Sequence, residues 1–525
     1  MQLQKNLRMS DRQNKTSLFS DFQSVDAAEW KEKMLQDLKG LPYEKLIWKT
    51  NEGIEIEPFY TSGNLSNLQY PDSLPGEFPF LRGNKKETCN WEIRQDIRVV
   101  DVKSANSQAL LALNRGATAL GFIIAEDKRL SESDFNLLLK DIFFDCININ
   151  FINHSTAAEI LELLFSSSKK LNIDPSRIVG SVNNDPLGYL SSHGFFNHPQ
   201  EMEFKNTASL IQNGASLLPN LKTLCINGSL FHNAGGTIVQ ELAFSLSMIS
   251  DYMEMLSSEG LTPETISKSI QMNLAVGPVY FMEIAKIRAA RFLFAKLGGA
   301  WGIKNENALK TFIHCSTSEW NQTIYDPYVN MLRSTTESMS AVIGSCDSLT
   351  VTPFDLAFRE TTAFSERIAR NTQIILKEEA MLDKVMDPAA GSYFIESLTN
   401  SIIEESWKLF LEIEDSGGYL SAFRTGEIQK RIKASANLRY QNISIRKEVL
   451  LGTNQFPDPA EKKPEDLSDS IAFPRKLAGN KNQIAEPLEF MRGSAFFEKL
   501  RLKAVGNRKK VFLLTIGNPV WRKAR

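Results

Sequence analysis

The sequence predicts an α/β fold in which short parallel strands alternate with helices. From about residue 92 to residue 385, short apolar and β-branched runs alternate with longer helical patterns, a pattern typical of parallel βαβ units. This span is long enough for an eight-unit barrel, which needs about 250 residues. The composition, 42% hydrophobic and 23% charged, is ordinary for a globular protein. A doubly wound sheet remains the alternative, because periodicity alone does not show closure.

The first 90 residues are expected to form an amino-terminal arm and an extended lead-in. Asp26 is a candidate helix cap, and apolar residues follow it at helical spacing at Ala27, Trp30, Met34 and Leu38. Residues 58–82 contain so many prolines and glycines that long regular elements are not expected there.

Residues 91–400 are expected to form the barrel. Its clearest helix is Phe281–Leu297, which is followed by Gly298 and Gly299, a pair typical of a helix end. The expected strands are Ile97–Val102, Ala119–Ile124, Ile147–Phe151, Ile178–Val182, Leu221–Ile226 and Thr311–Cys315.

Residues 401–505 are expected to form a helical linker region. Ile403–Leu411 and Gly418–Lys433 have helical patterns, and residues 457–474 are charged and contain prolines. Val511–Ile516 is an apolar run near the end of the chain. We expect it to be the first strand of a further, truncated or degenerate α/β domain over residues 506–525, because a lone strand cannot bury itself. The alternative is that this strand adds to an existing sheet.

Charge, cysteine usage and hydropathy exclude several classes of function. The formal net charge is −2, so neither nucleic acid nor an anionic membrane is an expected partner. The five cysteines show no CxxC spacing and the five histidines no metal-binding spacing. No apolar run reaches membrane-spanning length. A cytoplasmic protein without a metal site is therefore expected, and His232 is interpreted as structural rather than as an acid or base.

Long stretches of the chain resemble methylmalonyl-CoA mutases, in the order in which that family carries them. The resemblance rests on Leu46–Tyr60, Leu74–Gly83, Trp91–Gln95, Phe281–Leu297, Phe364–Gln373 and Met386–Thr399. It implies a TIM (β/α)8 barrel that holds an acyl-CoA along its axis, a helical linker and a flavodoxin-like cobalamin domain. It also implies adenosylcobalamin as the source of the radical.

The residues that hold substrate in active members are replaced where the two patterns can be aligned. Ser229 and Leu230 stand for a Tyr-His pair whose histidine donates to the thioester carbonyl, and leucine cannot form a hydrogen bond. Asn183 replaces a glutamine, and His193 falls at the position of an arginine that binds the substrate carboxylate. Asp347 replaces a neutral amide, where a carboxylate facing another carboxylate is unfavourable.

The resemblance implies an equally degenerate cobalamin loop near the end of the chain. Pro519 stands for the aspartate, Trp521 for the cobalt-ligating histidine and Ala524 for a glycine, while Gly517 is kept. Because an indole nitrogen has no lone pair to give, Trp521 cannot ligate cobalt. No catalytic, cofactor-binding or metal-binding residue is therefore expected in this chain.

Taken together, these replacements resemble those of the small, non-catalytic chain of heterodimeric mutases. The expected role is a structural partner of a catalytic large subunit, which would bind adenosylcobalamin and interconvert methylmalonyl-CoA and succinyl-CoA. The alternatives are a divergent acyl-CoA mutase and a barrel that senses acyl-CoA without turnover. Among the retained residues, Arg367 and Arg370 are expected to join a structural network rather than bind phosphate, and Asp387–Ser392 is expected to form a turn.

Overall fold

The computed structural model describes residues 25–66, 68, 70, 72–458, 460–473 and 482–504. The chain divides into two compact units, residues 1–67 and 68–525. Within the described residues, none of the helices has both the length and the apolar character that a membrane crossing requires. The boundaries expected near residues 90, 400 and 505 stay predictions.

The first unit contains the helix that the sequence predicted. Helix α2 (Ala27–Asp37) begins at Asp26, whose side chain accepts hydrogen bonds from the Ala28 and Glu29 N–H groups. Glu29 bonds back to the Asp26 N–H, which completes a capping box. Two short antiparallel strands follow, β1 (Trp48–Lys49) and β2 (Glu55–Ile56), with the 3-10 turns η1 (Tyr43–Lys45) and η2 (Ser62–Leu65) on either side.

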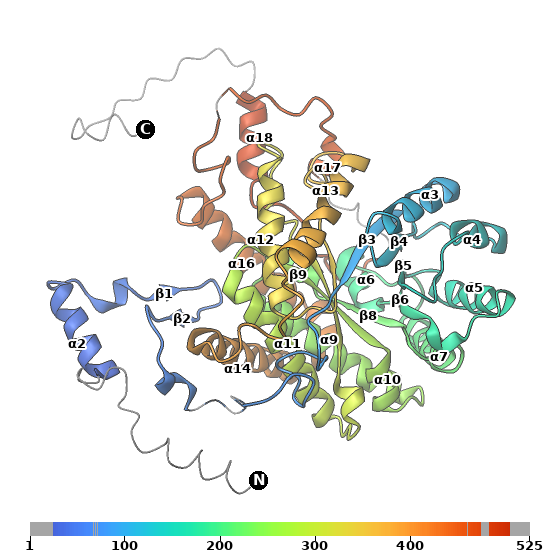
Figure 1. Ribbon diagram of the computed structural model, residues 1–525, viewed down its shortest axis with the longest axis horizontal. Helices are drawn as coiled ribbons and strands as arrows, with labels where there is room; N and C mark the ends of the chain where they lie inside the picture. The colour runs from blue at the N-terminus through green and yellow to red at the C-terminus, as the bar shows by residue number, and fades with distance from the viewer. Residues whose placement is uncertain are drawn as a thin grey trace, which may run out of the picture. The chain divides into compact units, whose positions relative to one another are not determined.

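The second unit is built on a closed barrel of parallel strands (Figure 1). On one side of the barrel, strand β11 pairs with β3. On the other side, one strand is interrupted at Thr223. Its first part, β7, pairs with β6, and its second part, β8, pairs with β9, so that this strand closes the barrel. Closure excludes the doubly wound sheet. The strands are β3 (Glu92–Arg98), β4 (Ala119–Ile123), β5 (Asn148–Ile152), β6 (Val179–Asn183), β7 (Leu221–Lys222), β8 (Leu224–Asn227), β9 (Ile270–Val276), β10 (Phe312–Thr317) and β11 (Ser348–Thr350).

Helices surround the strands on the outside of this barrel (Figure 1). Apolar side chains fill the layer between strands and helices, as where the Phe151 ring stacks on Phe122 and Phe135 at 5.8 and 5.5 Å. The helices between and after the strands are α3 (Val102–Leu113), α4 (Glu132–Leu138), α5 (Ala157–Lys170), α6 (Pro186–His193), α7 (Gln200–Leu217), α8 (Ser229–Asn233), α9 (Ile238–Ser258), α10 (Pro263–Ser269), α11 (Tyr280–Ala300), α12 (Val329–Ile343) and α13 (Ala363–Ile374).

One strand prediction requires correction, and two strands were missed. The first strand runs over Glu92–Arg98 rather than Ile97–Val102, because the Asp101 side chain accepts from the Ser104 N–H and starts helix α3 at Val102. Strands β9 and β11 were not predicted. Every residue of β9 is buried, so its polar residues, Gln271 and Asn273, mark the barrel interior and not a solvent-exposed face.

The predicted helix stop at Gly298 is wrong. Helix α11 continues to Ala300, and the chain leaves it through Gly302, whose φ is +79°. A Cβ at Gly298 would lie 2.5 Å from Leu309 Cδ2. This glycine therefore permits close packing of the helix and does not end it.

Five helices follow the barrel in the part of the chain that the structure describes. The prediction of one helix over Gly418–Lys433 is wrong, because the chain breaks at Gly426, whose φ is +82°. The predicted strand Val511–Ile516 lies outside the described residues. The helices are α14 (Tyr393–Asp415), α15 (Gly418–Arg424), α16 (Glu427–Ser444), α17 (Asp469–Ala472) and α18 (Ala495–Ala504).

Candidate functional site

A polar cavity of about 660 Å³ lies at the carboxyl ends of the barrel strands, where barrel enzymes place their sites. Its wall is built from the strand ends, the loops that follow them and helix α13. The side chains that decide its chemistry are Arg94, Asp96, Arg98, Asn183, Asn227, Ser229, Asn273, His314, Glu319, Glu366 and Arg370.

Strand β3 supplies the charged floor of the cavity. Arg94, Asp96 and Arg98 line it because alternate residues of a strand share a face. The Arg94 Nε atom donates to Asp96 Oδ1 at 2.6 Å, and Arg94 is only 3% exposed. This ion pair lies over Gly121, where a Cβ would come within 1.9 Å of Asp96 Oδ1. Glycine on β4 therefore gives the pair its room.

A chain of hydrogen bonds crosses one side of the barrel interior. The Ser181 hydroxyl lies 2.7 Å from Asn150 Oδ1 and 3.0 Å from Asn183 Oδ1. The Cys225 thiol continues the chain, with its Sγ atom 2.9 Å from the same Asn183 oxygen. Burial raises the pKa of this thiol to about 12, so Cys225 is a neutral donor and not a nucleophile.

A second chain of hydrogen bonds covers the other side. Gln271 donates to Asn273 Oδ1 at 2.8 Å, Asn273 donates to Asn227 Oδ1 at 2.8 Å, and Asn227 donates to Asp185 Oδ2 at 2.9 Å. Burial raises the pKa of Asp185. Barrel interiors are usually filled by branched apolar side chains, whereas this one is filled by amides that satisfy one another.

His314, on strand β10, also lines the cavity. Its ring is 6% exposed, and its Nδ1 atom shares a hydrogen bond of 3.2 Å with the Ser348 hydroxyl. Burial and the neighbouring Arg94 charge lower the pKa of His314 well below its usual value, so the ring is neutral.

The cavity is therefore a short bowl. Asn150, Ser181 and Gln271 are at most 2% exposed, and the lining found among the described residues stops above them. An extended ligand cannot run the length of this axis.

Two acids, Glu319 and Glu366, lie near the rim. Glu319 follows the end of β10 and is exposed to solvent. Glu366 is half-buried, and this burial raises its pKa; it accepts a hydrogen bond from Thr361 at 3.0 Å. Such a bowl can bind a polar ligand, but the described residues do not pair a nucleophile with a base inside it.

The structure brings only some of the predicted positions together. Asn183 and Ser229 line the cavity. Leu230 follows Ser229 in helix α8 and is not part of the lining. His193 ends helix α6 away from the cavity, where its ring stacks on Tyr189 with centroids 4.0 Å apart.

The predicted conflict at Asp347 is wrong. Asp347 precedes β11 at the amino end of the barrel, opposite the cavity, so it meets no ligand carboxylate there. It forms an ion pair with Arg291 at 2.9 Å and accepts the Ile313 N–H at 2.9 Å. Asp347 therefore pairs with the Arg291 guanidinium, and the expected repulsion between two carboxylates does not arise.

The described residues contain no cluster of His, Cys, Asp and Glu that could hold a metal ion. The positions that align with the family's cobalt-ligating loop lie outside the described residues; they are Gly517, Pro519, Trp521 and Ala524.

Sequence reasoning missed the charged floor and a buried ion cluster. The signal for the floor was present, because charges recur at every second position of Glu92–Arg98. The cluster joins three retained motifs. Arg288 donates to both Asp387 oxygens at 2.5 Å and to Glu396 at 2.6 Å, and Arg82 lies 3.3 Å from Glu396. Asp387 is thus an ion-pair partner and more than a turn former.

The network expected for Arg370 is present. Its guanidinium donates to Gln95 Oε1 at 2.5 Å and to the Arg115 carbonyl oxygen at 3.1 Å. These bonds tie helix α13 to strand β3, so Arg370 holds the cavity wall.

Comparison with known proteins shows that this chain is similar to methylmalonyl-CoA mutases. The model of the family described as "Methylmalonyl-CoA mutase" matches residues 49–127 and 130–481. The chain is 42% identical over 519 residues to the methylmalonyl-CoA mutase small subunit of Porphyromonas gingivalis, covering 97% of this chain and 82% of that one. The identity is 30% over 525 residues with the small subunit of Streptomyces virginiae, covering 97% and 82%.

More distant relatives include longer chains. The chain is 28% identical over 464 residues to the methylmalonyl-CoA mutase large subunit of Porphyromonas gingivalis, covering 84% of this chain and 64% of that one. It therefore spans about two thirds of the length of that large subunit.

Proposed function

This chain belongs to the methylmalonyl-CoA mutase family, and we propose that it is the non-catalytic small subunit of a two-chain mutase. In this proposal the large subunit binds adenosylcobalamin and interconverts methylmalonyl-CoA and succinyl-CoA. The small subunit holds the large one in its active conformation and itself contacts neither cofactor nor substrate.

The closed barrel axis carries the proposal. An acyl-CoA placed along the axis would have to displace the Arg94–Asp96 ion pair and the amide chains beneath it. Each buried donor or acceptor left without a partner would cost about 1–3 kcal/mol. The axis is therefore a packed core and not a substrate channel.

Two further observations support the same role. Leu230, in the place of the family's hydrogen-bonding histidine, lies outside the cavity lining. In Porphyromonas gingivalis a small subunit and a large subunit are separate chains, and this chain is similar to both. We therefore propose a heterodimer with a cognate large subunit, located in the cytoplasm.

The test is reconstitution. The chain alone, the cognate large subunit alone and an equimolar mixture are assayed for methylmalonyl-CoA isomerisation with added adenosylcobalamin. We expect turnover only in the mixture, and co-elution of the two chains at a fixed ratio. Cobalamin absorbance that co-elutes stoichiometrically with the isolated chain, or turnover by that chain alone, would refute a non-catalytic role.

One observation favours a second candidate, a sensor that binds an acyl-CoA without turnover. The bowl has about 660 Å³ of space, within the range of about 300–1,000 Å³ of small-molecule sites. Calorimetric titration of the isolated chain with methylmalonyl-CoA separates the two roles, because the structural role predicts no binding heat.

A further inference from the structure

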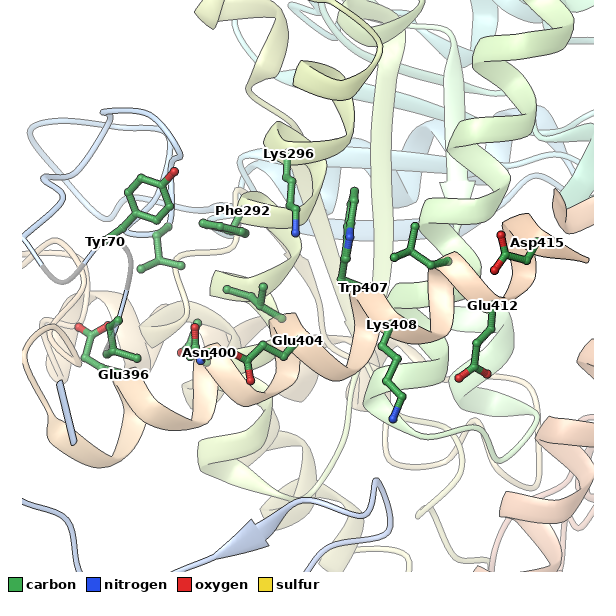
Figure 2. A pocket seen from close by; sticks show the side chains of 15 residues that line it. Tyr70, Phe292, Lys296, Glu396, Asn400, Glu404, Trp407, Lys408, Glu412 and Asp415 are labelled. Atoms are coloured by element: carbon green, nitrogen blue, oxygen red, sulfur yellow. Dashed lines mark hydrogen bonds between the residues drawn. The ribbon is translucent and has the colours of Figure 1, made fainter. Parts of the chain in front are cut away.

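A second hollow of about 470 Å³ lies on the outside of the barrel, beside helix α14 (Figure 2). The Phe292 and Trp407 rings line it. Lysines and carboxylates both lie along it, among them Lys296, Lys408, Glu404 and Asp415. Because both signs of charge are present, this hollow selects no class of ligand by charge.

A cluster of titratable side chains lies elsewhere on the barrel, at the carboxyl ends of strands β5 and β6. Three of the five histidines of the chain meet there. His154 lies in the loop after β5, His193 ends helix α6, and His198 lies in the loop before helix α7. None of the three lines the polar bowl, so the proposed function does not use them.

The Glu203 carboxylate, in the first turn of α7, is the centre of this cluster. It is 4% exposed, and its Oε1 atom accepts the His198 N–H at 2.8 Å. The same oxygen lies 3.3 Å from His198 Nδ1, while Oε2 lies 3.5 Å from His154 Nε2. One buried carboxylate therefore joins the loop after β5 to the loop between α6 and α7.

An aromatic stack fixes the position of the His154 ring. The Tyr189 ring lies between His154 and His193, with centroids 5.0 and 4.0 Å away. The Phe195 ring meets Tyr189 and His193 edge to face, at 5.9 and 6.0 Å. Because the His154 side chain is only 9% exposed, packing holds it facing Glu203.

Protonation of the imidazoles strengthens their contacts with Glu203. A neutral imidazole can donate one ordinary hydrogen bond, whereas an imidazolium adds the attraction of opposite charges. Burial acts to raise the pKa of Glu203, but the contact with His154 and the charges of His154 and His198 outweigh it, so this pKa lies below its usual value. Glutamate ordinarily loses its proton near about pH 4.3 and histidine near about pH 6.5. The ion pairs are therefore complete between about pH 4 and 6.5 and are lost as the pH rises further.

Two other charges approach the cluster from neighbouring elements. Glu126, which follows strand β4, accepts the His154 N–H at 3.2 Å and favours a charged imidazole. Arg424 of helix α15 donates to Gln200 Oε1 at 2.5 Å, at the start of α7, and opposes it. Because these two charges act against each other, the direct contacts with Glu203 decide the balance.

The loop between α6 and α7 also anchors a distant segment of the chain. The Gly194 carbonyl oxygen accepts the Ile484 and Ala485 N–H groups at 2.8 and 3.1 Å. At the end of α6, the Ser191 carbonyl oxygen accepts the Leu488 N–H at 2.8 Å. Residues 484–488, which lie between helices α17 and α18, are thus attached to the barrel through this loop and the end of α6.

We propose that Glu203, His154 and His198 form a proton-operated latch. In mildly acidic solution the charged imidazoles fasten the loop between α6 and α7 to the barrel, and with it residues 484–488. In alkaline solution the loop opens more often. This inference is independent of the proposed function, because it concerns only the barrel of this chain.

Hydrogen–deuterium exchange of the full chain, read by mass spectrometry, tests the latch. Protection factors at pH 6.0 and 8.0 are compared for peptides that contain residues 194–200 and 484–488. We expect protection of residues 194–200 to fall at least about fivefold from pH 6.0 to 8.0, because charge-assisted hydrogen bonds are about twice as strong as neutral ones. Residues 484–488 should lose protection in the same direction.

Three variants isolate the latch. Glu203→Gln removes the charge but keeps an oxygen that can accept the His198 N–H, so protection should no longer depend on pH. The matched control is Glu201→Gln, because Glu201 is exposed in the same first turn of α7; it should behave like the wild type. His198→Gln changes a side chain that is 47% exposed, and it should reduce the pH dependence in part.

Each outcome decides the inference. Equal protection of the wild type at both pH values overturns it. A change in protection that persists in Glu203→Gln also overturns it, since another group then titrates. Circular dichroism verifies that the variants are folded, and if Glu203→Gln does not fold, His198→Gln decides: an undiminished pH dependence in this variant contradicts the latch, and a reduced one supports it.

Discussion

Replacing Arg288 by methionine tests whether the retained family motifs maintain the scaffold. Arg288 is fully buried and donates to Asp387 at 2.5 Å and to Glu396 at 2.6 Å. Methionine keeps most of the side-chain volume and removes the charge. Both carboxylates then stay buried, with Arg82 nearby, 3.6 Å from Asp387 and 3.3 Å from Glu396.

The expected loss is large. Breaking a buried ion pair by removing one partner costs about 3–5 kcal/mol, because the remaining charge keeps its desolvation penalty. Arg82 compensates in part, so we expect about 3 kcal/mol. At about 2–4 °C per kcal/mol for a large domain, the melting temperature should fall by about 10 °C.

Calorimetry and urea midpoints measure this change in stability. The control is Arg129→Met, which removes a solvent-exposed ion pair with Glu159 and should cost less than about 1 kcal/mol. Adding Asp387→Asn to Arg288→Met should recover part of the loss, since it removes one unpaired charge. If the melting temperatures of Arg288→Met and Arg129→Met differ by less than about 2 °C, the retained motifs do not maintain the scaffold, and this interpretation is refuted.

Three further predictions concern other parts of the barrel. Burial raises the pKa of Asp251 to about 7 in the folded protein. Because this carboxyl group loses its proton at a lower pH in the unfolded chain, the free energy of unfolding should fall by about 4 kcal/mol between pH 4 and 7. In Asp251→Asn, urea midpoints measured over this pH range should change less than in the wild type. Gly121→Ala should cost at least about 2 kcal/mol in urea unfolding, because its Cβ would meet the Asp96 carboxylate; an unchanged midpoint would contradict the packed axis. Iodoacetamide at pH 8 should label the exposed Cys146 in the native protein and spare the buried Cys225, as mass spectrometry can check; rapid labelling of Cys225 would show an open interior.

The sequence alone determined the features that are set by local chemistry. Asp26 caps a helix because its side chain reaches two nearby N–H groups. Parallel strands were predictable because apolar runs alternate with helical patterns, although β9 escaped notice because it is buried on all sides. The family followed from long motifs, and the comparisons confirm it. The chemical effect of the replacements at Leu230 and Trp521 could be predicted from the sequence alone.

The tertiary structure decided which side chains meet. Closure depends on a strand broken at Thr223 that pairs with different neighbours in its two parts, which no local pattern encodes. Arg288 and Asp387 are 99 residues apart and form one ion pair, while Asp347 and the cavity lie at opposite ends of the barrel. Ion pairs and hydrogen bonds act over a few ångströms in space. Their partners are therefore fixed by the packing of distant segments and not by position along the chain.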